Sequence, residues 1–209
     1  MQVVVSPDQV QMSPGTIVRL LGSWRDYQTL AQQRGDTSIP RLKYRRGEIL
    51  LMSPLPVHGR DANIIADIVK ALLDHLDQDY EAFTPVTLEL PEEGGIEPDY
   101  CFYINNWEAA AGKQRINWQT DPPPDLVIEV DVTSFTQVED YLPYRIPEVW
   151  LLKQQALHIY ELQEGTYIAK SNSRYFPGMD VMDLTVRCFE AAYARNTGAA
   201  IRELRKWLT

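Results

Sequence analysis

The sequence predicts a mixed α/β or α+β fold in which a central mixed sheet is flanked by helices. Apolar residues recur at helical spacing over residues 58–76, the longest amphipathic segment of the chain. Short segments rich in β-branched and aromatic residues follow it, among them the apolar run at residues 126–132. Because further helical segments are interspersed among these strands, we expect one sheet covered by helices.

The N-terminal part is expected to be an arm followed by a capped helix. Residues 1–15 contain two prolines and show little periodicity, so we expect a flexible arm before a single domain over residues 16–209. Ser23 is a good helix N-cap, with Asp26 in the capping-box position three residues later. Gly35 marks the expected end of this helix.

The remaining elements follow from alternation and turn signals. Residues 41–45 and 48–52 alternate in polarity on either side of Arg46 and Gly47, which predicts a β-hairpin. After the long helix we expect strands at residues 84–90, 99–104 and 126–132, a short helix at 137–144, a strand at 148–153, a hairpin over 157–171, and helices at 181–193 and 198–208.

Composition limits the class of protein. The chain has 209 residues, of which 44% are hydrophobic, and this is enough for one substantial core. No apolar run is long enough to span a membrane, and the N-terminus lacks the pattern of a secretory signal. Cys101 and Cys188 lie far apart in the sequence, so buried free thiols are expected rather than a disulfide. Together these features predict a cytoplasmic protein with no membrane partner.

Acidic residues on consecutive expected strands are the strongest indication of chemistry. Asp99 begins one strand, Glu129 interrupts the apolar run of the next, and Asp131 shares the face of Glu129. Carboxylates are costly to bury unless a cation meets them, and oxygen ligands suit Mg²⁺ or Mn²⁺. One interpretation is therefore a metal site for phosphodiester hydrolysis. The alternative is that Asp99 caps a turn while Glu129 and Asp131 face solvent.

The basic residues are concentrated near the expected hairpin, although the formal net charge of −9 argues against a general nucleic-acid binder. Arg41, Lys43 and Arg45 alternate along one strand, so their side chains share a face on which phosphate could bind. A solvated strand near a sheet edge is the alternative. His58, at the start of the long helix, could contact phosphate or transfer a proton, or it could simply begin the helix.

Four segments resemble, in the same order, the motifs of the Uma-type family of restriction-endonuclease-like proteins. They are residues 41–54 followed by His58, the segment Glu97-Pro98-Asp99, residues 123–130 (PPDLVIEV) and residues 146–150 (IPEVW). The resemblance covers roughly residues 20–180 and implies the PD-(D/E)XK nuclease fold. It also implies that Asp99 and Glu129 are the metal-binding pair.

The sequence departs from the family pattern at three positions. Asp131 stands where the nuclease pattern places a lysine two residues after the second acid. Many members instead carry a lysine just before a tyrosine on the following helix, and the stretch that ends at Tyr141 has none. The acid expected in the first hairpin strand is Arg45 here. Either another cation, such as Lys153 or an arginine, fills the lysine's role, or catalysis is weak or lost.

Two hypotheses about function follow from the residues and the resemblance. The first is a Mg²⁺- or Mn²⁺-dependent endonuclease that acts on nucleic acid, with DNA as the expected substrate, and that works as a homodimer. In it, Asp99 and Glu129 hold the metal, Asp131 joins them, and either Lys153 or the row of Arg41, Lys43 and Arg45 balances charge on the phosphate. The second is a catalytically inactive protein of the same fold that binds nucleic acid or another protein.

Overall fold

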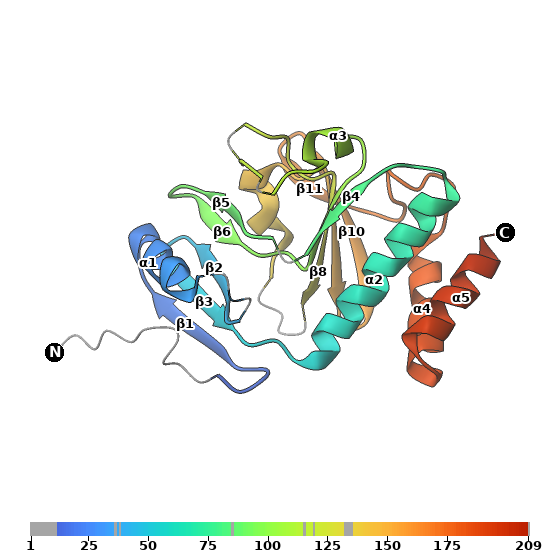
Figure 1. The fold of residues 1–209 in the computed structure, drawn as a ribbon, viewed down its shortest axis with the longest axis horizontal. Coiled ribbons are helices and arrows are strands. Elements are labelled where there is room, and N and C mark those ends of the chain that lie inside the picture. Colours follow the sequence, from blue (N-terminus) through green and yellow to red (C-terminus); the bar gives the residue numbers. More distant parts are fainter. Residues whose placement is uncertain are drawn as a thin grey trace.

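The structure is a computed structural model that describes residues 12–35, 37, 39–84, 86–114, 116–118, 120–131 and 136–208. The described residues form two β-sheets with helices on their outer sides (Figure 1). We call them the N-terminal sheet and the central sheet. The fold is thus a mixed α and β architecture, as the sequence predicts.

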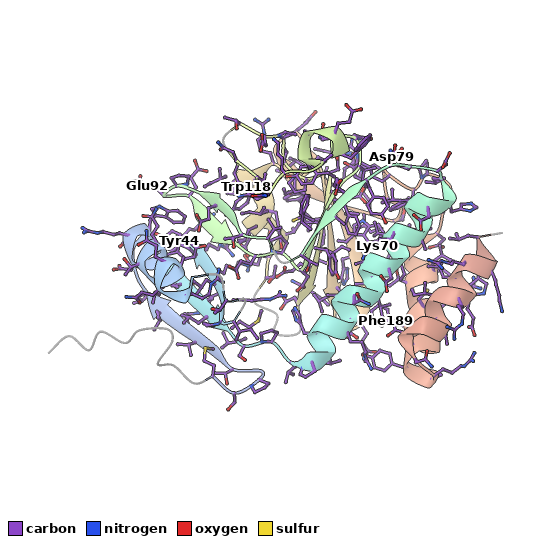
Figure 2. All side chains as sticks on the ribbon, viewed as in Figure 1. Tyr44, Lys70, Asp79, Glu92, Trp118 and Phe189 are labelled. Carbon is purple, nitrogen blue, oxygen red and sulfur yellow. The ribbon has the colours of Figure 1, made fainter. Side chains whose placement is uncertain are left out.

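The N-terminal sheet is five-stranded and antiparallel throughout. Its spatial order is β1 (Ile17–Leu21), β3 (Glu48–Met52), β2 (Arg41–Arg45), β6 (Gly94–Ile96) and β5 (Leu88–Leu90). The alternation of β2 buries Leu42 and Tyr44 against Tyr27 of helix α1 (Trp24–Arg34). Tyr44 is labelled in Figure 2, on the side of the molecule that α1 covers. The opposite face of β2 carries the basic residues.

The central sheet is six-stranded and mixed. Its spatial order is β11 (Thr166–Lys170), β10 (Ala156–Gln163), β9 (Glu148–Lys153), β8 (Leu126–Asp131), β7 (Tyr100–Tyr103) and β4 (Glu81–Phe83). Strands β8 and β9 run parallel, and the other neighbours run antiparallel. Along β8, Leu126, Ile128 and Val130 belong to one core, whereas Val127 belongs to a second core on the other face.

Helices cover one face of the central sheet. They are α2 (Pro56–His75), α4 (Val181–Ala194) and α5 (Thr197–Trp207), and they lie together at one end of Figure 1. Their apolar side chains, including Phe189 (Figure 2), bury the largest core of the described residues against β8 and β9. The opposite face packs against the 3₁₀-helix η2 (Val138–Tyr144) and strands β5 and β6. A short helix, α3 (Trp107–Ala110), follows β7.

Most predicted elements are present within a few residues of their expected bounds. The capping box between Ser23 and Asp26 is formed, and α1 ends at Gly35 as expected. Cys101 and Cys188 are buried free thiols. No helix among the described residues is long and apolar enough to cross a membrane. The expected arm at residues 1–15 lies mostly outside the described residues, and the single strand expected at 84–90 is wrong.

Candidate functional site

Asp99 and Glu129 lie close to each other at one end of the pairing of β7 with β8. Tyr100 pairs with Ile128 across these antiparallel strands, Asp99 directly precedes Tyr100, and Glu129 directly follows Ile128. The charge of Asp99 acts on Glu129. The amide of Asp99 donates to the carbonyl of Ile128 at 3.0 Å. Asp99 Oδ2 in turn accepts from the amide of Val130 at 2.8 Å. The two acids are thirty residues apart in the sequence, and this strand pairing brings them together.

The carboxylate of Asp99 is buried and fully engaged. Its Oδ1 accepts a hydrogen bond from Arg41 Nη1 and lies 2.8 Å from His58 Nε2. Burial alone would raise the pKa of Asp99, but the hydrogen bond from His58 and the charge of Arg41 hold that pKa below its usual value. Asp99 is therefore ionised at neutral pH.

Glu129 is half-buried and is oriented by two hydroxyl groups. Thr136 Oγ1 donates to Glu129 Oε1 at 3.0 Å, and the Tyr141 hydroxyl donates to Oε2 at 3.0 Å. Burial and the negative charge of Asp99 raise the pKa of Glu129 to about 7, although Lys43 and Arg41 oppose this rise. Burial and the charge of Glu129 also raise the pKa of Tyr141, so its hydroxyl stays protonated and continues to donate.

The basic residues of β2 share one face, as their alternation predicts, and each is paired with a buried carboxylate. Arg41 contacts Asp99, as described above. Lys43 Nζ and Arg45 Nη1 both lie 2.5 Å from oxygens of Asp140 on η2. Arg45 also donates to the side chain of Gln137 at 3.0 Å. These ion pairs tie the N-terminal sheet to η2, which carries Tyr141.

Asp131 and Lys153 meet beside the acidic pair. They are opposed in the parallel pairing of β8 and β9, and Lys153 Nζ lies 3.7 Å from Asp131 Oδ2. Asp131 also accepts from the amide of Thr136 at 3.1 Å, and Lys153 donates to the carbonyl of Thr136 at 2.7 Å. Both residues thereby position Thr136, whose hydroxyl holds Glu129.

A cavity of about 60 Å³ lies between the two sheets, next to Glu129. Thr136 and Tyr141, which follow β8 of the central sheet, line part of it. The N-terminal sheet contributes the basic residues Arg41 and Lys43 of β2 and the apolar residues Ile17, Leu50 and Met52. A wider groove of about 550 Å³ shares Lys43 and Leu50 with the cavity. Its lining includes the basic residues Arg19, Lys43, Arg45 and Arg46, and we call it the basic groove, although the acids Glu48 and Asp140 also line it.

The chemistry of the donors fits a hard divalent cation at Asp99 and Glu129. Both supply carboxylate oxygens, and a cationic group of the protein itself, Arg41, already contacts Asp99. Nδ1 of His58 is buried and has no hydrogen-bond partner among the described residues. Within the same residues, no cluster of three or more His, Cys, Asp or Glu side chains is arranged to hold a metal. Asp99, Glu129 and Asp131 therefore do not form the expected three-carboxylate cluster among these residues.

Two other acids of the matching motifs have structural contacts. Asp125 Oδ2 accepts from the successive amides of Ile104, Asn105 and Asn106 at 2.8, 3.0 and 3.1 Å, and Oδ1 accepts from Tyr175. Glu148 is buried, and burial raises its pKa against the hydrogen bonds that it accepts from Ser173, Arg174 and Trp150. These carboxylates stabilise loops rather than line the cavity.

Sequence reasoning missed the partners of Glu129. It interpreted Tyr141 as a packing residue and did not single out Thr136 or Asp140. The signal for Tyr141 and Asp140 was their place on the helix directly after the acidic strand. No local pattern marks Thr136, because its role depends on the path of the chain between β8 and η2.

A comparison with protein families gives a match over residues 24–186 to Uma2, described as "Putative restriction endonuclease". The chain belongs to the Uma2 family. Among solved structures, this Uma2 protein is similar to one described as "a putative nuclease belonging to DUF820" from Anabaena variabilis ATCC 29413. The identity is 17% and the TM-score 0.48, over 90% of this chain and 99% of that chain. No curated protein matches the sequence.

Two of the departures from the family pattern contact each other in this Uma2 protein. Arg45 replaces the expected acid of the hairpin, and Asp140 is the residue just before Tyr141, where a lysine is expected. Arg45 Nη1 lies 2.5 Å from Asp140 Oδ1. The two charges are exchanged relative to the pattern that the resemblance implies, and in this chain they form an ion pair.

Proposed function

We propose that this Uma2 protein is a divalent-metal-dependent endonuclease that hydrolyses phosphodiester bonds of nucleic acid, with DNA as the expected substrate. The observation that carries the proposal is the pairing of Asp99 with Glu129 beside a cavity that Arg41 and Lys43 also line. Mg²⁺ or Mn²⁺ is the expected ion, since both prefer oxygen ligands. When bound, the ion would act as a Lewis acid on the phosphate and lower the pKa of a water molecule.

The side chains of the protein hold and orient the reacting groups in this proposal. His58 and the amide of Val130 fix Asp99, whereas Thr136 and Tyr141 fix Glu129. Asp131 and Lys153 act through Thr136, so the structure supports a positioning role for Lys153. Lys43 lines both the cavity and the basic groove, and it is the better placed lysine to balance charge on a phosphate there.

The basic groove supports nucleic acid as the substrate in spite of the net charge of −9. Arg19, Lys43, Arg45 and Arg46 gather along it, next to the cavity. A phosphate backbone that follows this groove would pass the acidic pair. A homodimer belongs to the same proposal, because cutting both strands of a duplex by one site per chain calls for two copies.

The test is cleavage of plasmid DNA in the presence of Mg²⁺ or Mn²⁺ by the wild type and by D99N and E129Q. Each variant keeps the shape of the side chain but removes its charge, so we expect nicking to fall on the order of 100-fold or more. EDTA should abolish nicking by the wild type. The control is E161Q, which changes a carboxylate of β10 that pairs with Lys170 and should keep the wild-type rate.

Equal nicking by the wild type, D99N and E129Q would refute the assignment. A second candidate is an inactive protein that binds nucleic acid, and the engagement of both oxygens of Asp99 favours it. In that case the wild type would bind DNA without nicking it at any Mn²⁺ concentration.

A further inference from the structure

Arg41 is a cationic side chain that contacts Asp99, one residue of the acidic pair. It begins β2, and its Nη1 contacts Asp99 Oδ1 and lies 3.4 Å from His58 Nε2. Its side chain is 18% exposed, whereas that of Asp99 is 1% exposed. Arg41 also lines the cavity beside Glu129. The guanidinium therefore neutralises a buried carboxylate from the cavity side.

Three carboxylates act on this one guanidinium. Its Nη1 contacts Asp99, and it lines the cavity together with Glu97 and Glu129. A guanidinium stays protonated in proteins, so Arg41 is a permanent cation among these acids. Lys43 and Arg45 on the same strand are paired with Asp140 instead, so they do not take this role.

The oxygens of Asp99 leave little room for a second cation. Oδ1 contacts Arg41 and His58, and Oδ2 accepts from the amide of Val130. An ion that binds Asp99 must share Oδ1 with Arg41 or displace it. Two cations on one buried carboxylate repel each other strongly, because the surroundings screen them less than water does.

We propose that Arg41 competes with the divalent cation for Asp99. The guanidinium occupies the carboxylate of Asp99 until an ion displaces it. This inference rests on the proposed use of Asp99 and Glu129 as metal ligands. It adds that the metal affinity of the wild type is set by the free energy of breaking the contact between Arg41 and Asp99. The substitution of Arg41 should therefore strengthen metal binding, although the residue lies in the candidate site.

Calorimetric titration of the full chain with Mn²⁺, without nucleic acid, tests the competition. R41Q should bind Mn²⁺ roughly tenfold or more tightly than the wild type, because a competing unit charge is removed. The double variant R41Q/D99N should lose this gain. The matched control is R60Q, which removes an arginine that pairs with another buried aspartate, Asp61, outside the lining of the cavity, and its affinity for Mn²⁺ should equal that of the wild type.

Affinity of R41Q equal to or weaker than that of the wild type, or no Mn²⁺ binding by either, would overturn the inference. Should R41Q not fold without an ion, thermal unfolding in increasing concentrations of Mn²⁺ provides the test, because an ion that takes the place of the guanidinium should stabilise the folded variant. R41Q should gain more stability from Mn²⁺ than the wild type gains, and equal gains would refute the competition. Tighter Mn²⁺ binding by R41Q, with no cleavage of DNA by the wild type or the variant, would count against the endonuclease and leave the competition standing.

Discussion

Near neutral pH, folding changes the protonation of Glu129. Burial and the adjacent charge of Asp99 raise its pKa from 4.5 to about 7. The folded state therefore binds more protons than the unfolded state between these two values, and the stability gained from this binding is lost as the pH rises through about 7. This sign is opposite to that of Asp99, whose pKa is lowered.

We therefore expect the free energy of unfolding to fall by on the order of 2 kcal/mol between about pH 5 and pH 8 because of Glu129. E129Q removes the titrating group, so its stability should lack this part of the pH dependence. Urea unfolding of both proteins in EDTA, across that range, gives the comparison. Parallel pH profiles for the wild type and E129Q would show that Glu129 titrates normally.

At the same scale, the sequence singles out the two candidate acids but not their environment. Asp99 and Glu129 stand out because a carboxylate in or next to an apolar strand needs a partner. The partners of these acids come from elsewhere: Arg41 from a different sheet and Tyr141 from η2. No spacing in the sequence encodes these contacts, because they depend on how the two sheets pack.

Between elements, the link of β2 to η2 depends on buried ion pairs. Lys43 and Arg45 hold Asp140, whose side chain is 1% exposed. Because η2 also carries Tyr141, this link sets the position of a hydroxyl that orients Glu129. Substitution of Asp140 should therefore lower the free energy of unfolding and also disturb the position of Tyr141 at the site.

The exchanged pair of charges gives a prediction for a double-mutant cycle. R45E and D140K alone each place like charges together in a buried setting, and each should lower the free energy of unfolding by about 3 kcal/mol. The double variant restores attraction and should regain most of the loss, with Lys43 keeping the recovery incomplete. Urea unfolding of the four proteins measures the coupling.

The control for that cycle is the exposed pair Arg19–Glu48, whose side chains are 52% and 42% exposed and lie 3.7 Å apart. Exchanging these two charges should give a coupling below about 1 kcal/mol. A buried coupling no larger than this exposed one would mean that Asp140 does not link η2 to β2.

The strands that the sequence missed belong to segments whose pairing is not local. Residues 84–90 were expected to form one strand, but the chain passes there from β4 in the central sheet to β5 in the N-terminal sheet. Strand β6 contains Gly94 and Gly95, which weaken any strand signal. A Cβ at Gly95 would lie 2.4 Å from the Tyr27 hydroxyl, so glycine is needed for α1 to approach β6. Hairpins and amphipathic helices were predicted because their patterns are local.

At the scale of the whole molecule, helix α5 packs against helices of its own chain. Leu204 and Ala200 are buried in the core that α2 and α4 also form, and Arg187 lies over the ring of Trp207 at 3.8 Å. The structure shows that the chain itself covers the apolar face of α5.

L204A should therefore destabilise the monomeric fold by about 3 kcal/mol, through a cavity between α5 and α2. The exposed R202A, on the same helix, should change the free energy of unfolding by less than about 0.5 kcal/mol. Thermal unfolding together with light scattering separates stability from assembly. A change of oligomeric state in L204A without loss of stability would show that α5 serves assembly instead.

The contacts of Asp125 bear on how relatives of this protein are recognised. This residue belongs to the same matching segment as Glu129, yet its carboxylate gathers three successive amides of a distant loop. A homologue that kept the aspartate and lost the glutamate would still build the loop and still resemble the family, although it would lack one of the two proposed metal ligands. Genomic surveys that score this segment as a whole would therefore not separate homologues with both acids from homologues with the aspartate alone.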